Sequence, residues 1–238
     1  MGQSLEEQLR DYRQLGVVVI EDAIRGEQLT RLQAATDHWH AQSKEEWLDQ
    51  VESGDACPLW FDVPGALEKD EVFVEMVDHP SYIDLLEAIA DGELLLAGPL
   101  QVRATPPWPV AYTGWHPDRE RSEEQHPKLQ IYIGEVPAKS GEFAYVPGSH
   151  KTNVDTRYRP QRNDTMPGHM TIPGKAGTAI VFDNAGLHTA MDNNTPSPRK
   201  SMIIGYQQRR LAAPDDRFSA AAKWCATRRR RRLLGLEV

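Results

Sequence analysis

The stretch Trp115-His116-Pro117-Asp118 places an imidazole and a carboxylate two residues apart. On an extended chain, side chains at positions i and i+2 point to the same face. A histidine and a carboxylate presented together supply two ligands of the two-histidine, one-carboxylate triad, which holds ferrous iron and leaves neighbouring coordination positions open. The pattern H-x-D also arises at ordinary strand ends and turns, so this interpretation depends on a third ligand farther along the chain.

Three downstream histidines are candidates for that third ligand. His150 and His169 each lie beside Pro and Gly in a turn-rich stretch, which favours an ordinary turn role for both. His188 instead follows an apolar, strand-like segment at 178–183, which would deliver it to the rim of a β core. We therefore predict His188 as the partner of the H-x-D pair.

A cation and a hydroxyl follow His188 at Arg199 and Ser201, where another strand-like segment begins. Strand alternation places both side chains on one face. The planar guanidinium suits a carboxylate, and the hydroxyl adds a hydrogen-bond donor. An arginine inside a β core needs an anionic partner, which a dicarboxylate co-substrate would supply. The alternative is that Arg199 faces solvent at the start of its strand.

The elements that must position these residues fall into two groups. Apolar spacing with a capping box at Ser4 and Glu7 predicts a helix at 5–15. A buried strand at 17–20 follows, then helices from about 26 and at 81–90, with a loop at 53–69. After Gly92 short strands are expected at 94–96, 100–104, 109–114, 129–136, 143–146, 179–182 and 200–207. Helices first and strands afterwards predict a mainly β fold with flanking helices around a closed or double-sheet core.

We expect one domain over residues 1–238, made of a mostly helical part at 1–93, the β core at 94–210 and a helical or basic tail at 211–238. Residues 228–232 of that tail are consecutive arginines. The hydrophobic share of 39% and the charged share of 26% are those of a soluble globular protein.

The net charge and the first residues of the chain indicate which kind of partner to expect. No apolar run approaches the ~20 residues that cross a membrane, and the first residues lack a signal-peptide pattern. Cys57 and Cys225 are far apart and are interpreted as reduced thiols, so we expect a cytoplasmic protein. The net charge of −8 argues against nucleic acid as a partner. A small-molecule substrate is expected instead, for a monomer or homodimer without membrane contact.

Taken together, the motifs resemble the phytanoyl-CoA dioxygenase family. The resemblance rests on the H-x-D motif, the stretch at 141–151, the segment at 177–184, His188 and Arg199, and it runs from about residue 9 to about 208. It implies an iron(II)- and 2-oxoglutarate-dependent oxygenase on a double-stranded β-helix of the jelly-roll, cupin-like kind. It further implies that His116, Asp118 and His188 bind iron and that Arg199 pairs with the distal carboxylate of 2-oxoglutarate.

Other residues receive roles through the same resemblance. Arg103, with Gln101 on the same strand face, lies where relatives carry a basic residue that helps to hold the co-substrate. Many relatives have a hydroxyl residue two positions after the distal histidine, where this chain has Ala190, so Ser201 or Thr189 takes that role in our interpretation. The expected substrate-pocket residues are Trp60, Phe61, Tyr112, Trp115, Gln130 and Tyr132.

The chemistry that this implies is oxidation of a C–H bond, most simply hydroxylation, coupled to conversion of 2-oxoglutarate to succinate and carbon dioxide. The substrate would be a small organic molecule of secondary metabolism or catabolism. Halogenation is disfavoured because related halogenases have a small residue where Asp118 stands, whereas desaturation, epoxidation, ring closure and demethylation stay open. Two alternatives remain: a cupin-like metalloenzyme that does not use 2-oxoglutarate, and a non-catalytic small-molecule-binding protein on the same fold.

Overall fold

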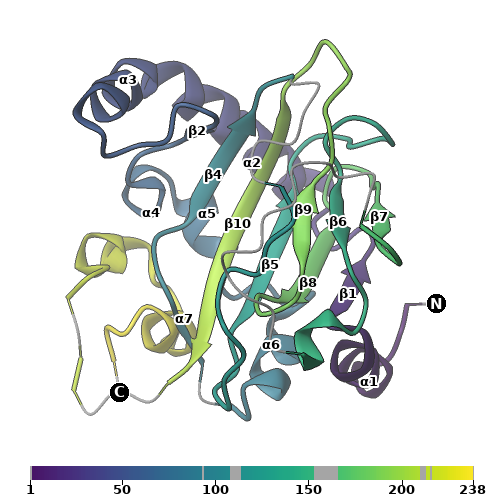
Figure 1. The fold of residues 1–238 in the computed structure, drawn as a ribbon. Helices are drawn as coiled ribbons and strands as arrows, with labels where there is room; N and C mark the ends of the chain where they lie inside the picture. Colours follow the sequence, from purple (N-terminus) through teal and green to yellow (C-terminus); the bar gives the residue numbers. More distant parts are fainter. Residues whose placement is uncertain are drawn as a thin grey trace.

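The computed structural model describes residues 2–92, 94–107, 114–152, 166–209, 213–214 and 216–237. Two antiparallel sheets form its centre (Figure 1). Their strands are β1 (Val17–Ile20), β2 (Phe61–Asp62), β3 (Leu94–Leu96), β4 (Gln101–Thr105), β5 (Pro127–Tyr132), β6 (Phe143–Tyr145), β7 (Met170–Ile172), β8 (Ala179–Asp183), β9 (His188–Ala190) and β10 (Arg199–Gln208). The larger sheet has the order β1-β8-β5-β10-β4-β2, with β3 also paired to β10, and the smaller sheet has the order β7-β6-β9. The predicted fold, mainly β with flanking helices, is confirmed.

The helices flank the larger sheet (Figure 1). They are α1 (Leu5–Leu15), α2 (Gly26–Gln42), α3 (Lys44–Ser53), α4 (Ala66–Lys69), α5 (Glu71–Glu75), α6 (Ile83–Ile89), α7 (Arg228–Leu233) and the 3-10 helices η1 (Ser149–Lys151) and η3 (Ser219–Trp224). The predicted capping box begins α1, and Gly16 ends it in the left-handed conformation at φ 80°. The sequence analysis did not predict α3, none of whose side chains is buried. The stretch expected to be a loop contains β2 and α4.

Strand alternation divides the side chains of the larger sheet between two cores. Alternate residues pack on the helical side: Leu129, Ile131, Ala179, Val181, Met202 and Ile204. On the other face, Tyr132, Ile180 and Phe182 pack against Phe143 and Tyr145 of the smaller sheet. Polar residues that alternate with the first set therefore point into the space between the two sheets.

Segments from the N-terminal and C-terminal parts of the chain contact the sheets and their helices. β1 pairs with β8 along its whole length, as expected for a buried strand, and β2 pairs with β4 at the opposite edge. In the C-terminal part, Arg230 Nε of α7 donates to Asp78 Oδ1 at 2.8 Å. The strand predicted at 109–114 lies outside the described residues except for Gly114. None of the helices in the described ranges is long and apolar enough to cross a membrane.

His79 connects the start of α6 to α2 and makes the stability of the fold depend on pH. Its Nδ1 accepts a hydrogen bond from the Ser81 N–H at 3.2 Å, and its Nε2 lies 2.7 Å from Gln28 Oε1, so the ring is neutral with its proton on Nε2. Burial lowers the pKa of His79 below its ordinary value. The unfolded chain therefore takes up a proton at this ring at higher pH than the folded chain, and the free energy of unfolding should fall between about pH 7 and about pH 5.

Urea titrations of wild type and His79→Gln at either end of that pH range should show a smaller decline for the variant. His38→Gln, at an exposed position of α2, is the matched control and should decline as wild type does. An equal decline in His79→Gln would contradict the assignment.

Candidate metal centre and adjoining pocket

Backbone pairing brings the predicted ligands together from two distant segments. His116 and His188 form an antiparallel bridge, in which the His116 N–H donates to the His188 carbonyl at 3.1 Å and the His188 N–H donates back at 3.0 Å. His188 is the first residue of β9, which pairs with β6. The N–H of Asp118 donates to the Asn184 carbonyl at 2.8 Å, which places its carboxylate beside the two rings.

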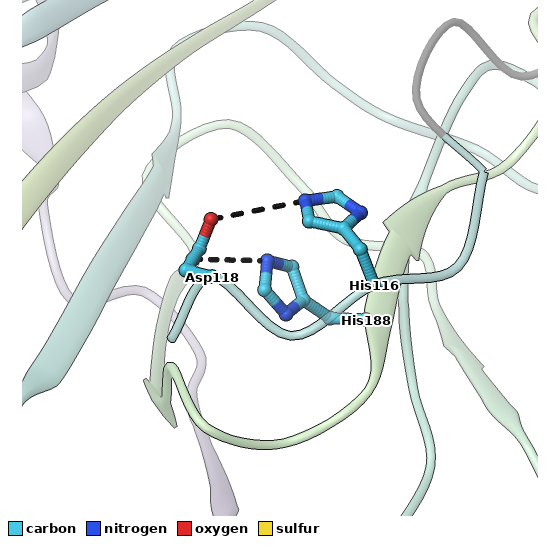
Figure 2. A group of neighbouring side chains, drawn as sticks. All are labelled: His116, Asp118 and His188. Atoms are coloured by element: carbon cyan, nitrogen blue, oxygen red, sulfur yellow. Dashed lines mark ion pairs between the residues drawn. The ribbon is translucent and has the colours of Figure 1, made fainter. Parts of the chain in front are cut away.

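The three side chains point toward one another (Figure 2). Asp118 Oδ1 is 3.7 Å from His116 Nε2, and Asp118 Oδ2 is 3.2 Å from His188 Nε2. One potential ligand atom from each residue lies within 4.8 Å of the others, so together they can hold a metal ion. This is the donor set of the triad that the sequence predicts, and it suits iron(II).

Backbone carbonyls orient both imidazole rings. His116 Nδ1 lies 2.8 Å from the Gly114 carbonyl, and His188 Nδ1 lies 2.9 Å from the Gly186 carbonyl. A carbonyl can only accept, so each Nδ1 carries a proton, which leaves each Nε2 as the atom that a metal would bind. Hydrogen bonds of this kind fix the tautomer and ring orientation in metal sites. The rings are thus prepared to bind through Nε2.

Lys128 of β5 donates to Asp118 Oδ2 at 2.8 Å. The Asp118 side chain remains 26% exposed. Burial by itself raises the pKa of Asp118, but the neighbouring His188 and Lys128 outweigh it and hold the pKa well below its usual range. The carboxylate is therefore ionised at neutral pH and available as an anionic ligand.

A cavity of about 210 Å³ adjoins the triad between the two sheets, and residues of β4, β5, β9 and β10 line it. Arg199 lies in its wall, only 4% exposed, and donates through one terminal nitrogen to the Gly141 carbonyl at 2.6 Å and through the other to Thr105 Oγ1 at 3.4 Å. A larger cavity of about 580 Å³ lies between α1 and the segment at 119–126, but none of the three triad residues lines it. The triad and a buried cation therefore meet in the smaller cavity.

Among the described residues, two buried polar atoms near this cavity have no partner, one in its wall and one on the adjacent strand outside the lining. Gln130 lines the cavity and is 3% exposed, and Ser201 is fully buried on the neighbouring strand. Within the ranges that the structure describes, neither Gln130 Nε2 nor Ser201 Oγ has a hydrogen-bond partner. Buried polar groups normally have partners, so a bound anion with several oxygens is consistent with this pocket.

The structure brings six of the other predicted site residues to this cavity and leaves the remainder elsewhere. Those that line it are Trp60, Gln101, Arg103, Gln130, Thr189 and Arg199. Phe61 lies on the other face of β2, with its ring centroid 4.9 Å from those of His40 and Trp47. Ser201 is not among the lining residues, and Tyr112 lies outside the described residues.

Two of the predicted pocket residues pack within the protein instead of lining the cavity. Trp115 is fully buried against Ala144 and Leu187. The Tyr132 hydroxyl accepts from the Phe143 N–H at 2.8 Å and donates to the Ile172 carbonyl at 2.7 Å, which ties the smaller sheet to β5. Both side chains therefore support the walls of the site.

Arg103 lines the cavity but already forms an ion pair with Asp62. Its Nε and a terminal nitrogen donate to the two carboxylate oxygens of Asp62 at 2.8 and 2.6 Å, and its guanidinium lies 4.3 Å from the centroid of the Trp60 ring. This ion pair joins β2 to β4 at the register Asp62↔Arg103. A role for Arg103 in holding the co-substrate stays a prediction, now with a competing carboxylate beside it.

The sequence interpretation missed Lys128, Asp62 and the two carbonyls that orient the histidines. Lys128 shares a strand face with Gln130 and Tyr132, so the same alternation would have found it had the expected strand begun one residue earlier. Asp62 had no such signal, because its partner lies forty-one positions away along the chain.

Gly186 supports His188 and leaves no room for a side chain. A Cβ at this position would lie 1.8 Å from the Tyr145 hydroxyl oxygen, and the Gly186 carbonyl accepts from His188 Nδ1. Gly186→Ala should lower the free energy of unfolding by about 1–3 kcal/mol and weaken metal binding. Gly134→Ala, where a Cβ would meet no atom within 4 Å, is the matched control. Urea denaturation and metal titration check both effects, and unchanged values for Gly186→Ala would contradict the role.

Several known proteins resemble this chain in sequence or in fold. The family model for phytanoyl-CoA dioxygenase (PhyH) matches residues 12–201. L-proline trans-4-hydroxylase from Streptomyces griseoviridis is 23% identical, and the match covers 60% of this chain and 66% of that protein. The chain thus spans slightly less than two thirds of the length of this curated relative.

Several solved structures share the fold. EctD from S. alaskensis, solved with 2-oxoglutarate and 5-hydroxyectoine, has a TM-score of 0.67 at 20% identity, covering 84% of this chain and 74% of that one. The carbocyclase SnoK from nogalamycin biosynthesis has a TM-score of 0.65 at 20% identity, covering 87% of each chain. The epimerase SnoN, solved with Fe³⁺, alpha ketoglutarate and nogalamycin RO, has a TM-score of 0.63 at 22% identity, covering 85% of this chain and 82% of that one. These likenesses confirm the jelly-roll core, and because the family model spans most of the chain, this protein belongs to the phytanoyl-CoA dioxygenase (PhyH) family.

Proposed function

We propose that this protein is an iron(II)- and 2-oxoglutarate-dependent dioxygenase that hydroxylates a C–H bond of a small organic molecule. The observation that carries the proposal is the pairing of an open-faced metal triad with a cavity whose wall contains a buried arginine. The triad alone would suit other metalloenzymes of this fold, and the pocket alone would suit a binding protein. Arg199 in the same cavity favours a 2-oxoglutarate-dependent oxygenase, because that function accounts for both the triad and the pocket.

Each residue of the site receives a definite task. His116, Asp118 and His188 hold the metal through two Nε2 atoms and a carboxylate. Arg199 binds the distal carboxylate of 2-oxoglutarate, with Gln130 and Ser201 as further polar contacts. Iron(II) with 2-oxoglutarate and dioxygen supplies the oxidising power, with succinate and carbon dioxide as the co-products. The protein orients the co-substrate and substrate, and the apolar rings of Phe143 and Phe182 exclude water from the same cavity.

Hydroxylation is the outcome that the likeness to L-proline trans-4-hydroxylase supports. SnoK and SnoN, on the same fold, are a carbocyclase and an epimerase. Substrate placement decides among such outcomes. Halogenation is disfavoured because related halogenases have a small residue where this chain has Asp118. We further propose one domain with helical, β-core and tail parts at 1–93, 94–210 and 211–238, a small-molecule substrate, and a monomer or homodimer in the cytoplasm.

An anaerobic titration tests the proposed function directly. Adding iron(II) and 2-oxoglutarate without oxygen should produce a visible charge-transfer band, and admitting air should release succinate. A panel of small molecules that includes L-proline should then reveal substrates by stimulated succinate release and by a hydroxylated product. Absence of the band together with absence of succinate would overturn the proposal. A band with succinate release and a product other than an alcohol would overturn only hydroxylation.

A further inference from the structure

We propose that Lys128 is a specificity-determining residue, which binds a carboxylate of the substrate beside the metal. The inference rests on the proposed function and deepens it, because it names the chemical class of the substrate as a small organic acid. It follows from the position of Lys128, from the pairing of the other cations in the cavity and from competition for one carboxylate.

Lys128 is placed to meet a substrate. It lies on β5, two residues before Gln130, and lines the same cavity as the triad and Arg199. Its side chain is 23% exposed, so the ammonium faces the cavity without being fully in solvent. A cation in such a partly desolvated place needs an anionic partner. In the structure Asp118 Oδ2 is that partner, at 2.8 Å.

The other cations that line the cavity have different assignments. Arg103 is paired in two hydrogen bonds with Asp62, so this couple contributes no net charge. Arg199 is assigned to 2-oxoglutarate by the proposed function. Among the described residues that line the cavity, Lys128 is the cation that remains for the substrate.

Metal binding would weaken the hold of Asp118 on Lys128. A divalent metal in the triad would draw on the same carboxylate that Lys128 contacts through Oδ2, so less of its negative charge would remain for the ammonium. The two charges of iron(II) are cancelled by the two carboxylates of 2-oxoglutarate. Among the charged side chains that line the cavity, Arg199 and Asp118 balance in number, and Arg103 is balanced by its partner Asp62. Counted over these groups, the loaded cavity has one further positive charge, on Lys128, which a substrate with a single carboxylate would neutralise.

A merely structural role for Lys128 would have different consequences. If the ammonium served only to orient Asp118, its loss would weaken metal binding and leave substrate selectivity unchanged. If it binds the substrate, its loss should remove the preference for acids while the metal and 2-oxoglutarate still bind. The two roles are therefore separable by measuring metal binding and acid selectivity in the same variants.

The experiment compares acid and amide pairs on the loaded protein. Zinc(II) replaces iron(II) so that ligand-observed NMR is free of paramagnetic broadening, and saturating 2-oxoglutarate occupies Arg199. The probes are L-proline with L-prolinamide, cyclopentanecarboxylate with its carboxamide, and benzoate with benzamide. In wild type at least one acid should bind roughly tenfold to a hundredfold more tightly than its amide. Lys128→Arg should retain the preference, and Lys128→Met should abolish it.

Lys200→Met is the matched control, because Lys200 lies on β10 and pairs with Asp37 outside the cavity. It should behave as wild type. No acid preference in wild type, or an unchanged preference in Lys128→Met, would overturn the inference. So would loss of the iron(II)–2-oxoglutarate band in Lys128→Met alone, which would assign Lys128 to the metal centre. Absence of the band in wild type would instead overturn the proposed function.

Discussion

Replacing Asp118 by alanine is expected to abolish iron-dependent turnover and to weaken iron(II) binding by at least about a hundredfold. Loss of groups that merely support a metal ligand costs roughly tenfold to a hundredfold in affinity, and here an anionic ligand itself is removed. The change also leaves Lys128 beside the metal position without its carboxylate partner, so cation repulsion adds to the loss. Anaerobic titration with iron(II) at saturating 2-oxoglutarate measures the affinity, and succinate release in air measures turnover.

Asp37→Ala provides the control for this change. The Asp37 side chain is 61% exposed and pairs with Lys200 on the outer surface, so the variant removes a carboxylate without touching the site. It should bind iron(II) and turn over as wild type does. Comparable thermal melting of both variants would exclude unfolding as the cause. Wild-type iron affinity in Asp118→Ala would remove this residue from the triad.

Arg199→Met is expected to weaken 2-oxoglutarate binding by roughly tenfold to several hundredfold while iron(II) still binds. Each charge-assisted hydrogen bond to a carboxylate contributes about 1.5–3 kcal/mol of binding free energy, and two such bonds contribute more than one. Methionine keeps much of the buried volume, so the wall of the cavity at β10 stays filled. Titration of the visible band with 2-oxoglutarate at fixed iron(II) gives the dissociation constant, and the rate at saturating 2-oxoglutarate should recover in part.

The neighbouring Lys200 offers the matched control for this second prediction. It occupies the next position on β10 with its side chain toward the outer surface, where it pairs with Asp37. Lys200→Met therefore removes a positive charge from the same strand, and we expect no change in 2-oxoglutarate affinity. Because Arg199 also donates to the Gly141 carbonyl, urea denaturation should accompany the titration. Equal 2-oxoglutarate affinity in Arg199→Met and wild type would show that another group anchors the co-substrate.

Local patterns in the sequence determined much of the framework. The capping box and the apolar spacing placed α1 at its observed bounds, and the β-branched run placed β1. Alternation grouped Arg199 with Ser201 and Gln130 with Tyr132, and the structure places Arg199 and Gln130 in the wall of the cavity between the sheets. These features depend on neighbours a few residues apart, through helix periodicity and strand alternation, which is why a linear pattern contains them.

Predicting the metal ligands required more than local strand and helix patterns. Alternation could present His116 and Asp118 together, and the apolar segment before His188 indicated a residue at the end of a strand. The resemblance to a family joined them into one site. The tertiary structure added the bridge between the two histidines and the carbonyls that turn both Nε2 atoms inward.

Only the tertiary structure decided which of the remaining candidates reach the pocket. Trp115 and Tyr132 became packing residues, and Phe61 turned away because the register of β2 directs Asp62 to Arg103 instead. These outcomes depend on pairing between strands that lie far apart along the chain, and a one-residue shift of register exchanges the two faces of a strand. The H-x-D motif thus indicated the kind of metal site, and the register of the sheets around it decided that Lys128 stands beside Asp118 of the triad.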